Sequence, residues 1–275
     1  MKHISEMKLV AAILACASIS APLEAHEFWI DTDLSQFPTH HQVSADIRVG
    51  ENLSGSALPY LNTTIRDMRH LSPKTSRVVE ARLGDRPAIK NVALRENGLH
   101  VLTVETNPSY IVFDDIPEFE AYLDYEGLSD IADEHLMRGL PETEIAEEYI
   151  RNARALIQLG PVQSDDVDQS SGLPFEIIVD GTPFADDLEN LKVRLTWQGR
   201  VVPDAQITMF YAPSGSLAPE GTERTLARTD STGFATFRMR GSGKYMLNAV
   251  KMTPVRGPGS VVWQSHWASL TFHIE

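Results

Sequence analysis

Apolar and polar residues alternate along the early part of the chain, with the period of two that half-buried strands show. The clearest run places Val43, Ala45, Ile47 and Val49 on one face. Three further β-like runs, separated by turn signals such as Asn97-Gly98, cover residues 76–83, 88–94 and 99–105. This pattern predicts a first domain built mostly of strands.

The same alternation returns towards the C-terminus. Short runs with apolar residues at every second position cover residues 191–197, 207–211, 235–239 and 245–249, and "HWASLTFHI" at 266–274 forms the final strand. Turn residues such as Gly199, Gly233 and Gly243 punctuate these runs. Short strands at this spacing are typical of an immunoglobulin-like β-sandwich.

Between residues 115 and 160 the period becomes helical. The pattern predicts a first helix that starts near Pro117 and stops at Gly127, and a second over residues 129–138 that begins at a serine cap. A third helix is predicted over residues 143–159, where Ile145, Tyr149, Ala153 and Leu156 line up. We expect the three helices to cover one face of the first β domain.

These changes of period predict a mainly β protein with two immunoglobulin-like β-sandwich domains and a helical segment between them. The stretch "VQSDDVDQSSG" at 162–172 is polar, acidic and aperiodic, and is interpreted as a linker. We therefore expect an N-terminal β domain over residues 26–161, with its helical segment at 115–160, and a C-terminal sandwich over residues 173–275.

The first 25 residues are typical of a secretory signal peptide, with Lys2 and Lys8 before an apolar run that ends close to the small residue Ala25. Cleavage after Ala25 would make His26 the first residue of the exported protein. A cut at Cys16, giving a lipoprotein, is the alternative, but Leu14 and the short apolar run before it favour the soluble exported form. No further segment suggests stable membrane insertion.

Charge and cysteine content narrow the chemistry. The formal net charge is −14, which disfavours nucleic acid and anionic membranes and is compatible with cations or basic partners. Cys16 is the single cysteine, so the exported chain has neither disulfides nor thiolates. No serine-elbow, phosphate-loop or His-Glu-x-x-His motif is present, so we expect no enzyme, with a copper oxidase of the histidine-brace kind as the remaining alternative.

His26 is the leading candidate for a metal ligand. As a first residue it would offer an α-amine and an imidazole, a combination that suits nickel, cobalt, copper or zinc. The alternative is that "HEFW" merely starts a strand anchored by Phe28 and Trp29. Further candidates are His100, His266 and Glu126, for which the alternatives are a hydrogen-bonded core histidine or a solvated helix face.

Seven stretches of the chain together resemble a family of bacterial periplasmic proteins, domain-of-unknown-function family 4198, of which some members are associated with nickel or cobalt uptake. They are "AHEFWI", "RVGENLSG", "PEFEAYLDYEGL", "EEYIRNARALIQLG", "LPFEIIV", "RTDSTGFATF" and "WQSHWASLTF". The resemblance implies export to the periplasm, two β domains and a role in transition-metal handling. Glu51 and Asn52 stand where the nickel-associated branch carries histidines.

Two functional hypotheses follow. The first is an exported binding protein that holds a divalent transition metal near His26 and supplies or buffers an envelope metal-uptake component. The second is a structural or interaction module that binds a protein or glycan of the cell envelope through surface aromatic residues such as Trp263 and Trp267.

Overall fold

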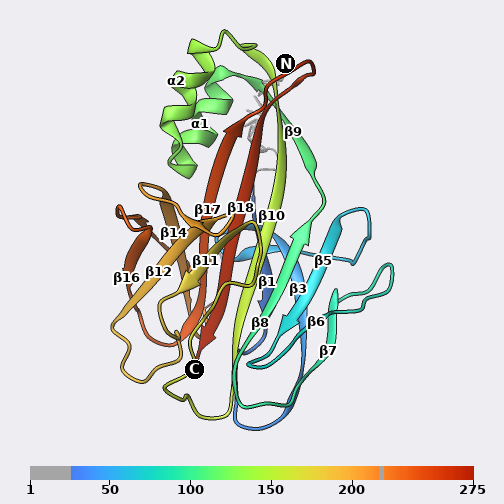
Figure 1. Ribbon diagram of the computed structural model, residues 1–275, viewed down its shortest axis with the longest axis vertical. Helices are drawn as coiled ribbons and strands as arrows, with labels where there is room; N and C mark the ends of the chain where they lie inside the picture. The colour runs from blue at the N-terminus through green and yellow to red at the C-terminus, as the bar shows by residue number, and fades with distance from the viewer. Residues whose placement is uncertain (1–25, 217–219) are drawn as a thin grey trace, which may run out of the picture.

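A computed structural model describes residues 26–216 and 220–275, and β-sheets make up most of that part of the chain (Figure 1). A ten-stranded sheet runs through the middle of the molecule. Its strands are ordered β15 (Glu223–Arg228), β14 (Gln206–Pro213), β17 (Gly243–Pro254), β18 (Val261–Ile274), β10 (Thr143–Leu159), β8 (Gly98–Thr106), β5 (Ile65–Leu71) and β6 (Ser76–Val78). Two more strands, β2 (Gln36–Phe37) and β9 (Ser109–Asp115), also pair with β10.

Two four-stranded sheets pack against this central sheet. The first contains β1 (Glu27–Thr32), β3 (His41–Glu51), β4 (Ser54–Leu58) and β7 (Ile89–Leu94). The second contains β11 (Phe175–Val179), β12 (Asn190–Trp197), β13 (Arg200–Val201) and β16 (Phe234–Arg238). The predicted mainly β, sandwich-like fold is confirmed.

The two smaller sheets cover opposite faces of the central sheet. On β10, Ala155 and Ile157 belong to the core under the first small sheet, whereas Leu156 belongs to the core under the second. Strand β8 divides in the same way, with Val104 in the first core and Val101 in the second. Because successive residues of a strand point to opposite faces, the sandwiches share one sheet as their common wall.

The predicted third helix is wrong, because residues 143–159 form the long strand β10. The helical spacing of Ile145, Tyr149, Ala153 and Leu156 is coincidental. From Tyr149 to Leu159 every residue is buried, since both faces of the strand are covered, and such strands lack the alternation that identifies a half-buried strand. Strand β10 pairs in parallel with β18, from Ala146 to Ala155, and so joins the two halves of the chain.

The two other predicted helices are present as α1 (Ile116–Glu126) and α2 (Ser129–Met137). Asp115 caps α1 by accepting a hydrogen bond from the Glu118 backbone N–H at 3.0 Å. The predicted serine cap of α2 is wrong, because Ser129 is its first helical residue and Leu128 holds the cap position without a side-chain bond.

The helices pack on the end of the central sheet, at the top of Figure 1, and not on the first β domain alone. Phe119 and Leu123 of α1 share a core cluster with residues of β9 and β10 and with Val250 and Trp263 of β17 and β18. The expectation that they cover a face of the first domain is therefore corrected to a cap over strands from both halves. No helix in residues 26–216 and 220–275 is long and apolar enough to cross a membrane.

The acidic stretch at 162–172 is tied to its neighbours. Asp168 accepts two hydrogen bonds from the Arg154 guanidinium of β10, at 2.7 and 3.1 Å, and one from the Val179 N–H of β11 at 2.9 Å. Asp166 accepts a bond from the Gln158 amide at 2.8 Å. Both aspartates are buried, so their hydrogen bonds hold this segment against β10 and β11.

Most of the other predicted strands are observed within a residue or two of their expected positions. Residues 41–49, 88–94 and 99–105 match β3, β7 and β8, and the predicted runs at 191–197, 207–211 and 235–239 match β12, β14 and β16. Strands β17 and β18 are also present, but β17 continues five residues beyond the predicted run and β18 begins five residues before it. The predicted run at 76–83 is shorter than expected, because β6 ends at Val78 after three exposed residues.

Candidate functional site

His26 lies directly before β1 and faces the end of β3. Its Nδ1 atom lies 2.9 Å from Oε1 of Glu51, and the side chains are 11% and 55% exposed, respectively. The two residues border an open cavity of about 600 Å³ lined by β3, β4 and the hairpin between them. A carboxylate on one ring nitrogen fixes the orientation of an imidazole, as it does for many metal-bound histidines. The nitrogen left for a ligand is Nε2.

Three buried glutamates, on three different elements, interact electrostatically in series, and the first of them also interacts with Glu51. Glu27 of β1, Glu126 of α1 and Glu147 of β10 are 2%, 4% and 1% exposed. Burial, followed by repulsion from Glu51, raises the pKa of Glu27 to about 7. Burial, followed by repulsion from Glu27, raises the pKa of Glu126 to about 8. We refer to these three residues as the glutamate cluster.

The third member of the glutamate cluster is held by hydrogen bonds. Burial raises the pKa of Glu147 to about 7, against the hydrogen bonds from Ser265 and Tyr122, which lower it. Tyr122 donates to Glu147 at 3.3 Å, and the Ser265 hydroxyl donates to the same oxygen. The Asn248 amide contacts Glu126 at 3.4 Å. The cluster is therefore poised to gain or lose protons near neutral pH.

Arginines balance the glutamate cluster only in part. Arg224 acts on Glu27 and Glu126, and Arg151 acts on Glu147, each lowering the pKa of the carboxyl without overcoming its burial. Arg151 also donates to the His26 carbonyl at 3.2 Å. A cation that enters next to His26 would favour ionisation of the cluster, because opposite charges stabilise each other at short range.

The candidate residues from the sequence do not all meet. His26 and Glu126 lie in one region, linked through Glu27. His100 and His266 lie elsewhere: their partners on β10 are Ile157 and Ile150, seven residues and therefore roughly 23 Å apart along the strand. Within residues 26–216 and 220–275, no three His, Cys, Asp or Glu side chains are grouped so that they could hold a metal ion.

His100 and His266 both occupy core positions. His100 is fully buried and forms a hydrogen bond with His70, between Nδ1 and Nε2, at 2.9 Å. His266 packs edge-on against Trp197 of the second small sheet, with ring centroids 4.3 Å apart. Burial lowers the pKa of His266 to about 4. His266 therefore faces the second sandwich, on the opposite side of the central sheet from the glutamate cluster.

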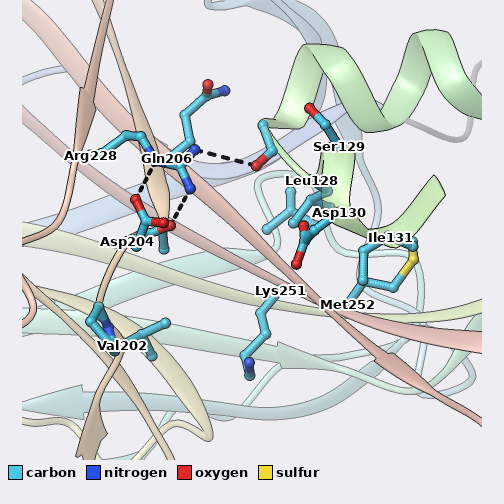
Figure 2. A pocket seen from close by; sticks show the side chains of 14 residues that line it. Leu128, Ser129, Asp130, Ile131, Val202, Asp204, Gln206, Arg228, Lys251 and Met252 are labelled. Carbon is cyan, nitrogen blue, oxygen red and sulfur yellow. Dashed lines mark hydrogen bonds and ion pairs between the residues drawn. The ribbon is translucent and has the colours of Figure 1, made fainter. Parts of the chain in front are cut away.

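A separate cavity of about 400 Å³ lies where the turn between α1 and α2 meets the loop before β14 and the upper part of β17 (Figure 2). Arg228 crosses it, donating to Asp204 Oδ1 at 2.7 Å and to the Gly127 carbonyl at 3.5 Å. Lys251 and Asp130 also line the space. Because its lining carries charges of both signs, this cavity favours neither anionic nor cationic ligands.

Sequence reasoning missed Glu27, Glu51 and Glu147 as members of the site. Glu27 lies in a strand whose first four residues are all buried, so alternation gives no sign of its burial. Glu147 lies in the segment predicted to be helical. The motif "HEFW" names Glu27 as the neighbour of His26, which is the one signal in the sequence that points to it.

Taken together, the fold and the site define a mainly β, double-sandwich protein with a histidine at an open cavity and three buried ionisable carboxylates, one of them on the next residue. The chain belongs to the family described as "Domain of unknown function (DUF4198)", whose match covers residues 23–253. No curated protein matches the chain.

Two solved structures share only a weak likeness. The crystal structure of chicken CNTN1 FN1-FN3 domains has 8% sequence identity and a TM-score of 0.19, with 88% of this chain and 66% of that one covered. Dimeric latent PorU from Porphyromonas gingivalis has 12% identity and a TM-score of 0.18, with 91% and 20% covered.

Proposed function

We propose that this protein is an exported, periplasmic binding protein for a divalent transition metal, nickel, cobalt or copper, and that it supplies or buffers an envelope uptake system. The observation that carries the proposal is the imidazole of His26, oriented by Glu51 at the edge of an open cavity. Neutral imidazole is the commonest protein ligand for these metals.

The glutamate cluster supports the same function. Glu27 follows His26 directly and is buried, with a pKa raised to about 7 by that burial. An incoming cation favours its ionised form, so metal binding would release protons near neutral pH. Glu51 already occupies Nδ1, so chelation by Nδ1 together with a free α-amine would require the carboxylate to move away. The structure therefore favours Nε2 as the ligand.

The interaction hypothesis loses the observation on which it was based. Trp263 and Trp267 are 0% and 4% exposed, so the expectation that they lie at the surface is wrong. Trp263 donates its indole N–H to His135 at 3.0 Å, and Trp267 donates to Ser265 at 3.0 Å. Both rings belong to the core that holds the helices. The histidine-brace alternative needs a second histidine, and none lines the His26 cavity within the described residues.

The decisive experiment titrates the protein, exported by its own leader, with Ni²⁺, Co²⁺, Cu²⁺ and Zn²⁺ by calorimetry, with native mass spectrometry to report the first residue and any retained metal. We expect a site tighter than roughly 10 μM, about −7 kcal/mol. His26→Ala abolishes it, and Glu51→Gln weakens it by about 10–100-fold, as loss of an orienting carboxylate does.

His40→Ala is the matched control, because His40 is an exposed histidine that does not line the cavity. It should leave the affinity within about twofold of wild type. The proposal fails if no metal binds more tightly than roughly 10 μM, or if the His26→Ala protein binds as well as wild type.

A further inference from the structure

A small polar cavity lies beside His70 and His100, away from the site proposed for metal. It has a volume of about 90 Å³ and is lined by residues from the ends of β5, β7 and β8 and from β6: His70, Ser72, Thr75, Arg77, Ala93, Arg95, Glu96 and His100. Organic ligands use roughly 300–1,000 Å³. The space therefore suits a small ion.

Hydrogen bonds fix the tautomers of the two histidines. His100 Nε2 lies 2.7 Å from the Glu96 carbonyl oxygen, which can only accept, so Nε2 carries the proton. In neutral imidazole the other nitrogen then accepts, so His100 Nδ1 receives a hydrogen bond from His70 Nε2 at 2.9 Å. His70 Nδ1 is left with a lone pair, on a ring that lines the cavity.

The ring of His70 stays neutral in this arrangement. Burial, followed by repulsion from His100 and Arg77, lowers its pKa to about 4. Burial also lowers the pKa of His100. His70 therefore offers the cavity a hydrogen-bond acceptor and not a cation at neutral pH.

The charge of the cavity comes from two arginines. Arg77 and Arg95 are exposed residues that line the cavity, and within the described part of the chain neither forms an ion pair with a carboxylate. Glu96 supplies the one carboxylate of the lining, and it accepts a hydrogen bond from Ser72 at 3.3 Å. Two guanidinium groups against one carboxylate favour an anion, and guanidinium is the side-chain group best matched to oxyanions.

We propose that this cavity binds a small oxyanion that carries a proton, with inorganic phosphate as its ligand. Arg77 and Arg95 pair with the phosphate oxygens, and the Thr75 hydroxyl is available as a donor, whereas the O–H of Ser72, 3.0 Å from it, is donated to Glu96. The O–H of hydrogen phosphate donates to His70 Nδ1. Sulfate has no proton at neutral pH, so it would place an oxygen lone pair against the lone pair of His70 and near the carboxylate of Glu96.

The test is calorimetric titration of the full exported protein with inorganic phosphate and with sulfate, at neutral pH and equal ionic strength. We expect phosphate to bind at least about tenfold more tightly than sulfate. Arg77→Gln and Arg95→Gln each weaken phosphate binding by about fivefold or more. Lys74→Gln is the matched control, because Lys74 is exposed in the same turn but does not line the cavity, and it should change the affinity by less than twofold.

A second variant tests the acceptor. His70→Phe keeps a ring of similar size and removes the lone pair, so the preference for phosphate over sulfate should vanish, with circular dichroism checking that the protein is folded. Glycerol phosphate distinguishes a free ion from a phosphorylated molecule and should bind more weakly than inorganic phosphate. Equal affinity for sulfate and phosphate, tighter binding of glycerol phosphate, or an equal effect of Lys74→Gln would each overturn the proposal.

This site is independent of the proposed metal site. His100 pairs with Ile157 of β10, whereas the carbonyl of His26 is bound by Arg151, six residues and therefore roughly 20 Å away along the strand. His26→Ala should leave phosphate binding unchanged, and Arg77→Gln should leave metal binding unchanged.

Discussion

Replacing Glu126 by glutamine removes a buried carboxyl whose ionised form the fold cannot solvate. Burial, followed by repulsion from Glu27, raises the pKa of this carboxyl from 4.5 to about 8. A carboxyl whose pKa is higher in the folded than in the unfolded chain takes up a proton on folding. The folded state therefore keeps its full stability below the unfolded-state pKa of 4.5. It loses stability as the pH rises from that value through the folded-state pKa of about 8.

The size of the effect follows from this shift. With 1.36 kcal/mol per pKa unit, titration of Glu126 lowers the free energy of unfolding by about 1 kcal/mol at about pH 5.5 and by about 4 kcal/mol at about pH 8. Glutamine does not titrate and keeps an oxygen that can accept the Asn248 hydrogen bond. The stability advantage of Glu126→Gln should therefore be about 3 kcal/mol larger at about pH 8 than at about pH 5.5.

The assay is urea denaturation followed by tryptophan fluorescence at both pH values, with an unchanged slope as the check that the transition is comparable. Glu120→Gln is the control, since Glu120 is exposed on the same helix, and its effect should stay within about 0.5 kcal/mol at either pH. If the advantage of Glu126→Gln is the same at both pH values, or smaller at the higher one, burial of an ionisable Glu126 is refuted.

Two further predictions concern contacts between different parts of the fold, the Asp168–Arg154 ion pair and the packing of Gly127 against Gln206. Asp168→Ala leaves the buried Arg154 guanidinium without its main partner and should lower the free energy of unfolding, measured by urea denaturation, by about 3–5 kcal/mol. Asp180→Asn is the control, because it removes a half-exposed ion pair and should lower it by less than about 1 kcal/mol. Equal losses in the two variants would contradict the prediction. Gly127→Ala should lower stability by more than the about 1–2 kcal/mol of a left-handed residue, because its Cβ would lie 2.7 Å from the Cβ of Gln206, which a side-chain rotation cannot move away. Gly139→Ala is the control, because Gly139 has φ 62° and open space around an added Cβ, so only the left-handed backbone conformation is penalised. If both variants lose the same stability, the contact with Gln206 contributes nothing.

The alternation of apolar and polar residues in the sequence was sufficient to predict most strands that have one solvent-exposed face. Strand β3 alternates between buried and more exposed positions from Val43 to Ile47, and the prediction there is confirmed. The helix that ends at Gly127 is confirmed for a local reason, because an aspartate cap and a left-handed glycine suffice to define it. These features depend on residues within a few positions of each other.

Strand β10 shows where local reasoning ends. Its C-terminal part, from Tyr149 to Leu159, is buried on both faces by two separate sheets, so its polar residues do not alternate with apolar ones. Arg154 is buried because Asp168 and the Ile177 carbonyl meet it there. Those partners come from chain segments that the sequence pattern treats as a linker and another domain.

The residues of the candidate site also differ in whether the sequence alone could identify them. His26 could be selected from the sequence, because its place after a leader-like segment and before "EFW" is a local property. The burial of Glu27, Glu126 and Glu147 could not, because it results from β1, α1 and β10 meeting at one end of the central sheet. The sequence by itself determined which side chains can ionise or bind. Only the tertiary structure decided which of them leave water, and desolvation is the main cause of their shifted pKa values.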